Sequence, residues 1–204
     1  ITALGEERAF VVGHDWGGVV AWDFAMSYPE ALRGLAVLNL PHPQRMAKGL
    51  TTLRQIRKSW YVFAFQLPVV PERAIARDDF AVIRKMMGWA LKRRPDAAAE
   101  VERYVDAMRA PGAVTGPVNY YRAAIRYAAA NMRRWRRIAV PVLVIWGEKD
   151  PALGAELAAP SARWVPHARV ERLPDANHFV QLDAPDRVNR LLVEYLDGRR
   201  AEGA

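Results

Sequence analysis

The chain has 204 residues, 51% of them hydrophobic, which is enough for one sizeable core and a subdomain. It contains no cysteine, and its four histidines show no metal-ligand spacing, so we expect no disulfide, no metal and no cofactor. The net charge is +8, but the basic residues lie among acidic ones along predicted helices, and no apolar run reaches the about 18–20 residues of a membrane span; we therefore expect neither a nucleic-acid nor a membrane partner.

Four short apolar runs predict the strands of a buried sheet. They cover residues 8–14, 32–40, 140–150 and 168–178. Between the first two runs, residues 17–30 have the pattern of a helix that stops before Pro29. Strands that are separated by helices are typical of a parallel sheet with crossover connections. The sequence therefore predicts an α/β fold.

A long helical insertion separates the second and third predicted strands. It contains few strand signals and has helical patterns over residues 51–67, 71–94, 95–110 and 117–135. We predict that residues 44–137 form a helical cap on a core made of residues 1–43 and 138–204. A closing amphipathic helix is predicted over residues 185–198, where Gly198 ends it.

The first predicted strand leads through Gly13-His14-Asp15-Trp16-Gly17 into a helix. A strand, a G-x-nucleophile-x-G turn and a helix form the nucleophile elbow, which lifts one side chain to the carboxyl edge of the sheet. Here that side chain is Asp15, and the backbone N–H of Trp16 is expected to act as an oxyanion donor. On this motif alone, the alternative that Asp15 caps the following helix is the better interpretation.

Two residues further along the chain favour the catalytic interpretation. Asp150 ends the third predicted strand and His178 ends the fourth. The order nucleophile, acid, histidine is that of the α/β-hydrolase triad. Each residue also has a simpler explanation, because Asp150 could cap a turn before Pro151 and His178 could be an ordinary loop histidine. Three such residues at strand ends, in this order, favour a triad of Asp15, Asp150 and His178.

With these motifs in place, the chain resembles the epoxide hydrolase family of the α/β-hydrolase fold, in which GHDWGG is the nucleophile motif. The resemblance runs from about residue 8 to residue 197 and includes NLPHP, GEKD and NHF. It implies a partial α/β-hydrolase fold, in which four C-terminal parallel strands carry crossover helices and a helical cap insertion.

The resemblance also implies two cap tyrosines that hold the epoxide oxygen. SWYVFAFQLP matches the segment of the first and places it at Tyr61; GPVNYYRA matches that of the second and places it at Tyr121, since another aromatic usually precedes it. The alternative is that both tyrosines only pack the cap. The cap aromatics Trp60, Phe63, Phe65 and Trp89 are expected to line an apolar substrate pocket.

The residue types suit the opening of a small apolar epoxide to a diol. Asp15, with an ordinary pKa of ~3.9, is already ionised and would form an alkyl ester. A tyrosine would protonate the departing oxygen, and His178, oriented by Asp150, would activate water against the ester. The alternative is a haloalkane dehalogenase, in which the Trp16 indole would hold a halide; the paired tyrosines argue against it, because a halide needs no proton.

The elbow comes unusually early in this chain. The α/β-hydrolase fold normally has four strands and two helices before the elbow strand, and this sequence has neither these nor the HGxP loop that carries the second oxyanion donor. We therefore expect the C-terminal portion of a longer, cytoplasmic protein, with any targeting signal upstream. We expect this chain alone to be nearly inactive, and an inactive fragment is the alternative. The strand over residues 8–14 would be an exposed sheet edge.

Overall fold

The computed structural model describes residues 1–92 and 94–201 and divides into two compact units. A sheet unit contains Ile1–Lys58 and the residues from Met132 onward, and a helical unit contains Ser59–Asn131. Residue 93, predicted in a cap helix, and residues 202–204, predicted in the core, lie outside the described residues.

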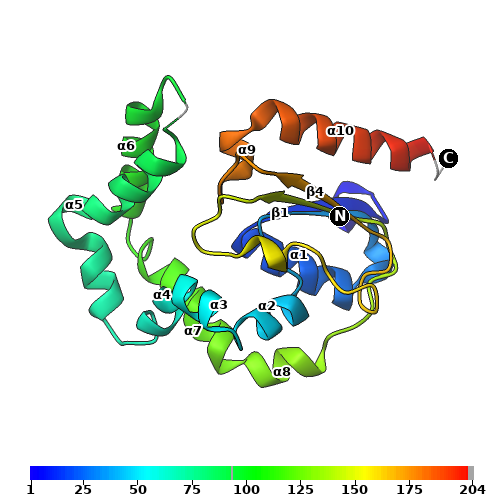
Figure 1. The fold of residues 1–204 in the computed structure, drawn as a ribbon, viewed down its shortest axis with the longest axis horizontal. Helices are drawn as coiled ribbons and strands as arrows, with labels where there is room; N and C mark the ends of the chain where they lie inside the picture. The colour runs from blue at the N-terminus through cyan, green and yellow to red at the C-terminus, as the bar shows by residue number, and fades with distance from the viewer. Residues whose placement is uncertain (93, 202–204) are drawn as a thin grey trace. The chain divides into compact units, whose positions relative to one another are not determined.

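The sheet unit contains four parallel strands in the order β1-β2-β3-β4 (Figure 1). Their bounds are Ala9–His14 for β1, Leu32–Leu38 for β2, Val142–Gly147 for β3 and Ala168–Leu173 for β4. The predicted α/β fold with four parallel strands and crossover helices is confirmed. Because the strands are parallel, their carboxyl ends meet at one edge, which is where the loops that carry function are expected.

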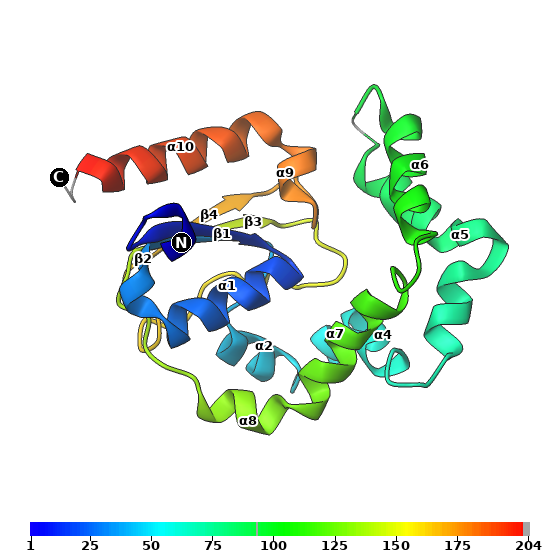
Figure 2. The ribbon, with the colours of Figure 1, turned by 180° about the vertical axis from the view of Figure 1, so that it is seen from behind.

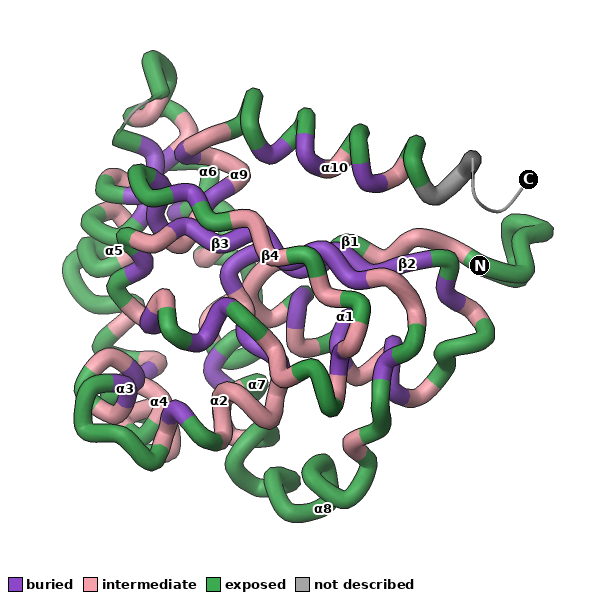
Figure 3. The backbone as a smooth tube through the Cα atoms, turned by 45° about the vertical axis from the view of Figure 1, so that its right-hand side comes forward, coloured by how far each residue is buried: buried purple, intermediate pink, exposed green. Residues whose placement is uncertain are grey.

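The central strands are buried on both faces. Along β2, Leu35 and Val37 belong to one apolar core and Ala36 and Leu38 belong to the other, as the two-residue period of a strand requires. Helix α1 (Trp16–Ser27) covers the first face and α10 (Pro185–Ala201) covers the second, as Figures 1 and 2 show from opposite sides. Figure 3 shows the resulting burial of β2 and β3.

Short elements connect these layers. They are the 3-10 helices η1 (Thr2–Leu4), η2 (Pro29–Ala31) and η3 (Ala155–Leu157) and the α-helices α2 (Pro43–Gly49), α3 (Leu53–Lys58) and α9 (Val180–Asp183). The predicted insertion began at residue 44, whereas α2 and α3 cluster with the sheet. The buried Gln55 side chain explains this in part, because it bonds the Ala152 carbonyl at 2.8 Å and the Gly154 amide at 3.1 Å.

The helical unit is built from α4 (Trp60–Ala64), α5 (Val70–Ala90), α6 (Ala97–Met108) and α7 (Thr115–Arg126), and α8 (Ala128–Arg133) follows. The predicted helices 51–67 and 117–135 are each broken in two, at Ser59 and at Tyr127. Neither position carries a glycine or proline, the residues by which a sequence indicates that a helix ends.

Helix α5 is also kinked, where the sequence predicts one continuous helix. Asp78, Asp79 and Phe80 have left-handed backbone angles, with φ between 49° and 61°. Ion pairs of 2.8 Å from Arg84 and Arg109 hold the Asp79 carboxylate at this kink. The run is rich in charged helix formers, so local propensity could not reveal a bend that distant side chains stabilise.

The prediction that Gly198 ends the last helix is wrong, because α10 continues to Ala201. A glycine inside a helix costs only about 1 kcal/mol relative to alanine, so it marks a helix end only when the backbone also turns left-handed there. No helix within the described residues is long and apolar enough to cross a membrane.

Strand β1 forms one edge of the sheet among the described residues, since it pairs only with β2. Val12 on this strand is 48% exposed, and Val20 on α1 is 60% exposed. An open, apolar strand edge is a site of self-association, and a lysine on it opposes pairing. We therefore predict that the 204-residue chain, expressed alone, self-associates, and that Val12→Lys reduces the association.

Light scattering and sedimentation measure this effect. Val193→Lys is the matched control, because Val193 is similarly exposed on α10, away from the edge, and its replacement should leave the association unchanged. A monomeric wild-type chain, or equal effects of both lysines, would show that the β1 edge does not drive self-association.

Candidate active site

Asp15 lies on a tight turn between β1 and α1, with φ 49° and ψ −124°. Such angles are rare for a residue with a side chain and are characteristic of a nucleophile elbow. Gly13 makes room for the turn, because a Cβ there would lie 2.4 Å from the Gly17 carbonyl oxygen. Asp15 occupies the N-cap position of α1, but its side chain makes no capping hydrogen bond there.

The fold brings the three residues predicted as a triad together within the sheet unit. Asp150 follows β3 and His178 follows β4, at the same sheet edge as Asp15. The His178 Nδ1 atom lies 2.7 Å from Asp150 Oδ2, and its Nε2 atom lies 3.6 Å from Asp15 Oδ1. The imidazole therefore lies between two carboxylates. The Asp150 side chain is fully buried, and the Asp15 side chain is 39% exposed.

The Asp150 carboxylate is held by several donors besides His178. Asn39 Nδ2 donates to Oδ2 at 2.8 Å, and the amides of Ala152 and Leu153 donate to Oδ1 at 2.8 and 2.9 Å. Burial tends to raise the pKa of Asp150, but these bonds and the charge of His178 lower it below its usual value. The carboxylate therefore stays ionised and orients His178.

Asn39 is a site residue that sequence reasoning missed. Its side chain also bridges the β2 and β3 ends, since Nδ2 donates to the Gly147 carbonyl at 3.2 Å and Oδ1 accepts from the Gly147 amide at 2.8 Å. It is fully buried, with a left-handed φ of 41°. The available signal was a polar residue directly after a buried strand, within the NLPHP motif.

The two carboxylates change the protonation of His178. Burial tends to lower its pKa, but the hydrogen bond with Asp150 and the nearby charges of Asp15 and Asp150 outweigh burial and raise the pKa to about 10. Burial tends to raise the pKa of Asp15, whereas His178, His14 and a backbone hydrogen bond from Trp16 lower it. The site therefore holds an imidazolium between two anions, and the Trp16 backbone contacts the predicted nucleophile.

His14, next to Asp15 in sequence, contacts both the backbone and the ring of His178. Its Nε2 atom donates to the backbone oxygen of His178 at 2.9 Å, and the two rings lie 5.0 Å apart. Burial and the charge of His178 lower the pKa of His14, so that it is the neutral partner of the pair. No role was predicted for His14 from sequence, because its neighbours in the chain do not show which distant loop it contacts.

The turn that carries His178 is braced from α9. The Asp183 carboxylate accepts from the Asn177 amide at 2.9 Å, and Asn177 Oδ1 accepts from the Phe179 amide at 2.8 Å. Asp183 and Asn177 are both buried. These bonds fix the backbone on either side of the histidine, and sequence reasoning missed both residues.

The two tyrosines predicted as acids are neighbours within the helical unit. The rings of Tyr61 on α4 and Tyr121 on α7 lie 5.6 Å apart at an angle of 80°, and Phe65 packs against both. Trp60 and Phe63, predicted to line the substrate pocket, are 65% and 51% exposed. The catalytic and pocket roles of these residues stay predictions.

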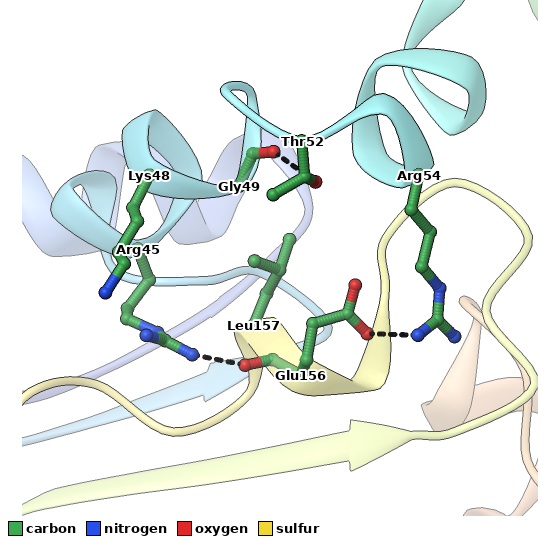
Figure 4. A pocket seen from close by; sticks show the side chains of 7 residues that line it. All are labelled: Arg45, Lys48, Gly49, Thr52, Arg54, Glu156 and Leu157. Carbon is green, nitrogen blue, oxygen red and sulfur yellow. Dashed lines mark hydrogen bonds and ion pairs between the residues drawn. The ribbon is translucent and has the colours of Figure 1, made fainter.

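A separate cavity of about 330 Å³ lies in the sheet unit between α2, α3 and η3 (Figure 4). Arg45, Lys48 and Arg54 line it together with Glu156, which pairs with Arg54 at 3.5 Å. None of the triad side chains lines this cavity. Among the described residues there is also no cluster of three side chains able to hold a metal ion.

The parallel sheet, the elbow and the acid–histidine pair define an α/β-hydrolase. The family model described as "alpha/beta hydrolase fold" matches residues 1–185, and the chain belongs to this family. It is 37% identical over 198 residues to AB hydrolase superfamily protein YfhM of Bacillus subtilis, covering 96% of this chain and 68% of that one.

The predicted resemblance to epoxide hydrolases is confirmed. The chain is 32% identical to human epoxide hydrolase 4, covering 96% of this chain and 55% of that protein. It superposes on the epoxide hydrolase of Bacillus megaterium, solved in complex with an inhibitor, with a TM-score of 0.83 and 29% identity, over 97% of this chain and 72% of that one. The chain thus spans between about half and three quarters of these relatives.

Proposed function

We propose that the protein is an epoxide hydrolase that opens a small apolar epoxide to a diol through an ester on Asp15. The observation that carries the proposal is the position of His178, with Nδ1 on Asp150 and Nε2 facing Asp15. The similarity to epoxide hydrolases and the adjacent cap tyrosines support it.

In the first step, the ionised Asp15 carboxylate attacks an epoxide carbon. A carbon–oxygen bond forms to Asp15, the ring carbon–oxygen bond breaks, and its electron pair stays on the departing oxygen. That alkoxide would be as basic as the conjugate base of an acid of pKa ~15.7, so a tyrosine of pKa ~10 can protonate it. Tyr61 and Tyr121, whose rings pack together in the helical unit, are the proposed proton donors.

Ester formation itself prepares the second step. It removes the negative charge of Asp15, one of the two carboxylates that raise the pKa of His178. The pKa of His178 then falls, its Nε2 proton leaves to solvent, and the neutral ring can accept a proton from water. The resulting hydroxide adds to the ester carbonyl, with the Trp16 amide as oxyanion donor. The bond between the carbonyl carbon and the substrate oxygen then breaks, the imidazolium of His178 gives its proton to the leaving alkoxide, and the diol is released. The Asp15 carboxyl loses its proton, which restores the carboxylate, and the tyrosinate takes up a proton from solvent.

The test is turnover of the protein as its gene encodes it, with styrene oxide and with 1-chloroalkanes. We expect diol from the epoxide and no halide from the chloroalkane. In a single turnover in water that carries heavy oxygen, the label should enter the Asp15 carboxylate, because water attacks the ester carbonyl. Halide release with an inert epoxide would establish the dehalogenase alternative, and no turnover of either substrate would favour an inactive fragment.

A further inference from the structure

Arg122 directly follows Tyr121 on α7 and ties this helix to its neighbours. Its Nε atom donates to the Phe65 carbonyl at 3.1 Å, and Nη2 donates to the Leu67 carbonyl at 2.8 Å. Phe65 caps the C-terminal end of α4, the helix that carries Tyr61, and Leu67 lies in the turn that follows it. One guanidinium therefore joins the two segments that carry the tyrosines.

The same guanidinium forms a two-pronged ion pair with Glu72 in the first turn of α5. The Nη1–Oε1 distance is 2.6 Å and the Nη2–Oε2 distance is 3.1 Å. Both side chains are mostly covered, with 26% and 18% exposed, and the Arg122 hydrogen bonds lower the pKa of Glu72. A bidentate pair fixes orientation as well as distance, so it holds the guanidinium plane in one position.

Gln66 adds a second connection between the two helices. Its Nε2 atom donates to the Val62 carbonyl on α4 at 2.8 Å and to the Tyr121 carbonyl on α7 at 3.3 Å. Gln66 thus binds the backbone of Tyr121 itself, and Arg122 anchors the residue that follows it. Both connections act on the backbone around Tyr121, so they fix the part of α7 from which its ring extends.

We propose that Arg122 is a positioning residue that holds Tyr121 against Tyr61, so that both hydroxyls reach one epoxide oxygen. The inference rests on the proposed function, in which the tyrosines are paired acids. Two acids act on one oxygen only when both lie within hydrogen-bond distance of it, and a displacement of about 1 Å can slow a reaction about a hundredfold. A lysine at this position would keep the charge but lose the planar fork.

The test compares Arg122→Lys with wild type in the complete protein. We expect alkylation of Asp15 to slow by about ten- to a hundredfold, while hydrolysis of the ester, once formed, keeps its rate. Arg126→Lys is the matched control, because Arg126 lies one turn further along α7, exposed and stacked on the Tyr127 ring, and should leave both rates unchanged.

Fluorine NMR of fluorotyrosine-labelled protein reports the ring positions without any reaction. The Tyr61 and Tyr121 signals should shift in Arg122→Lys and stay in place in Arg126→Lys. If wild type never alkylates Asp15, the proposed function fails, and the fluorine signals still decide whether Arg122 holds the ring pair. The proposal would be overturned if Arg122→Lys left the signals unshifted, alkylated Asp15 at the wild-type rate, or slowed both steps equally. Should Arg122→Lys not fold, Glu72→Gln, which removes the ion pair alone, replaces it under the same criteria.

Discussion

Replacement of His178 by glutamine should trap the protein as an alkyl ester on Asp15. Alkylation needs only the carboxylate and the proton donors, whereas ester hydrolysis needs a base on the opposite ring nitrogen from Asp150. General-base catalysis is worth typically ~10²–10⁴-fold, so hydrolysis should slow by that factor and the ester should accumulate. Mass spectrometry of the Asp15 peptide after mixing with an epoxide measures one added substrate per chain.

The matched control is Asp15→Asn, which lacks the nucleophile and should gain no mass. This variant also checks the charge coupling. The Asp15 carboxylate contributes to the high His178 pKa of about 10, so its neutral replacement should lower that pKa toward the ordinary ~6.5, as NMR titration of the imidazole would show. Mass on another residue, or an ester in Asp15→Asn, would remove Asp15 as the nucleophile.

The charge coupling also sets how stability depends on pH. Because the folded-state pKa of His178 lies above its unfolded value, its ion pairs stabilise the fold fully below pH ~6.5 and lose that effect as the pH rises through about 10. Asp150 and Asp15 have lowered pKa values, so their contribution is present above ~3.9 and is lost as the pH falls further.

Removal of both cap hydroxyls should nearly abolish alkylation. Tyr61→Phe and Tyr121→Phe should each slow ester formation, and the double variant should lose ~10²–10⁴-fold, the usual value of general-acid catalysis. The phenyl rings preserve the packing with Phe65, so the loss would come from the missing protons and not from the fold. Rapid mixing followed by mass spectrometry in the His178→Gln background isolates this step from ester hydrolysis.

Tyr120→Phe serves as the control, because Tyr120 neighbours Tyr121 on α7 and is 53% exposed. Its replacement should leave alkylation at the wild-type rate. A large loss in Tyr120→Phe instead would move the second acid to the neighbouring position. Wild-type alkylation by the double variant would assign both tyrosines to packing and strengthen the dehalogenase alternative, since a halide leaves without a proton.

Much of the sheet unit could be predicted from sequence, because residues close together in the chain determine its strands and the elbow. The β2 residues alternate between two cores, and such a run of apolar residues has no other stable place than a sheet covered on both faces. Gly13 and Asp15 marked the elbow, since only glycine tolerates the 2.4 Å approach of the Gly17 carbonyl. Strand-end positions then indicated Asp150 and His178, because parallel strands end at one edge.

The supports of the site depended on residues far apart in the chain. Asn39 and Asp150 are 111 residues apart, and His14 and the His178 carbonyl are 164 apart. Arg122 reaches Glu72 across 50 residues, and Arg109 holds the kink at Asp79 across 30. A polar side chain in a sequence shows which bonds it can make, but only the folded chain decides which partner comes within 3 Å. The sequence by itself therefore determined the strands, the elbow and the order of the triad, while the tertiary structure decided what orients them.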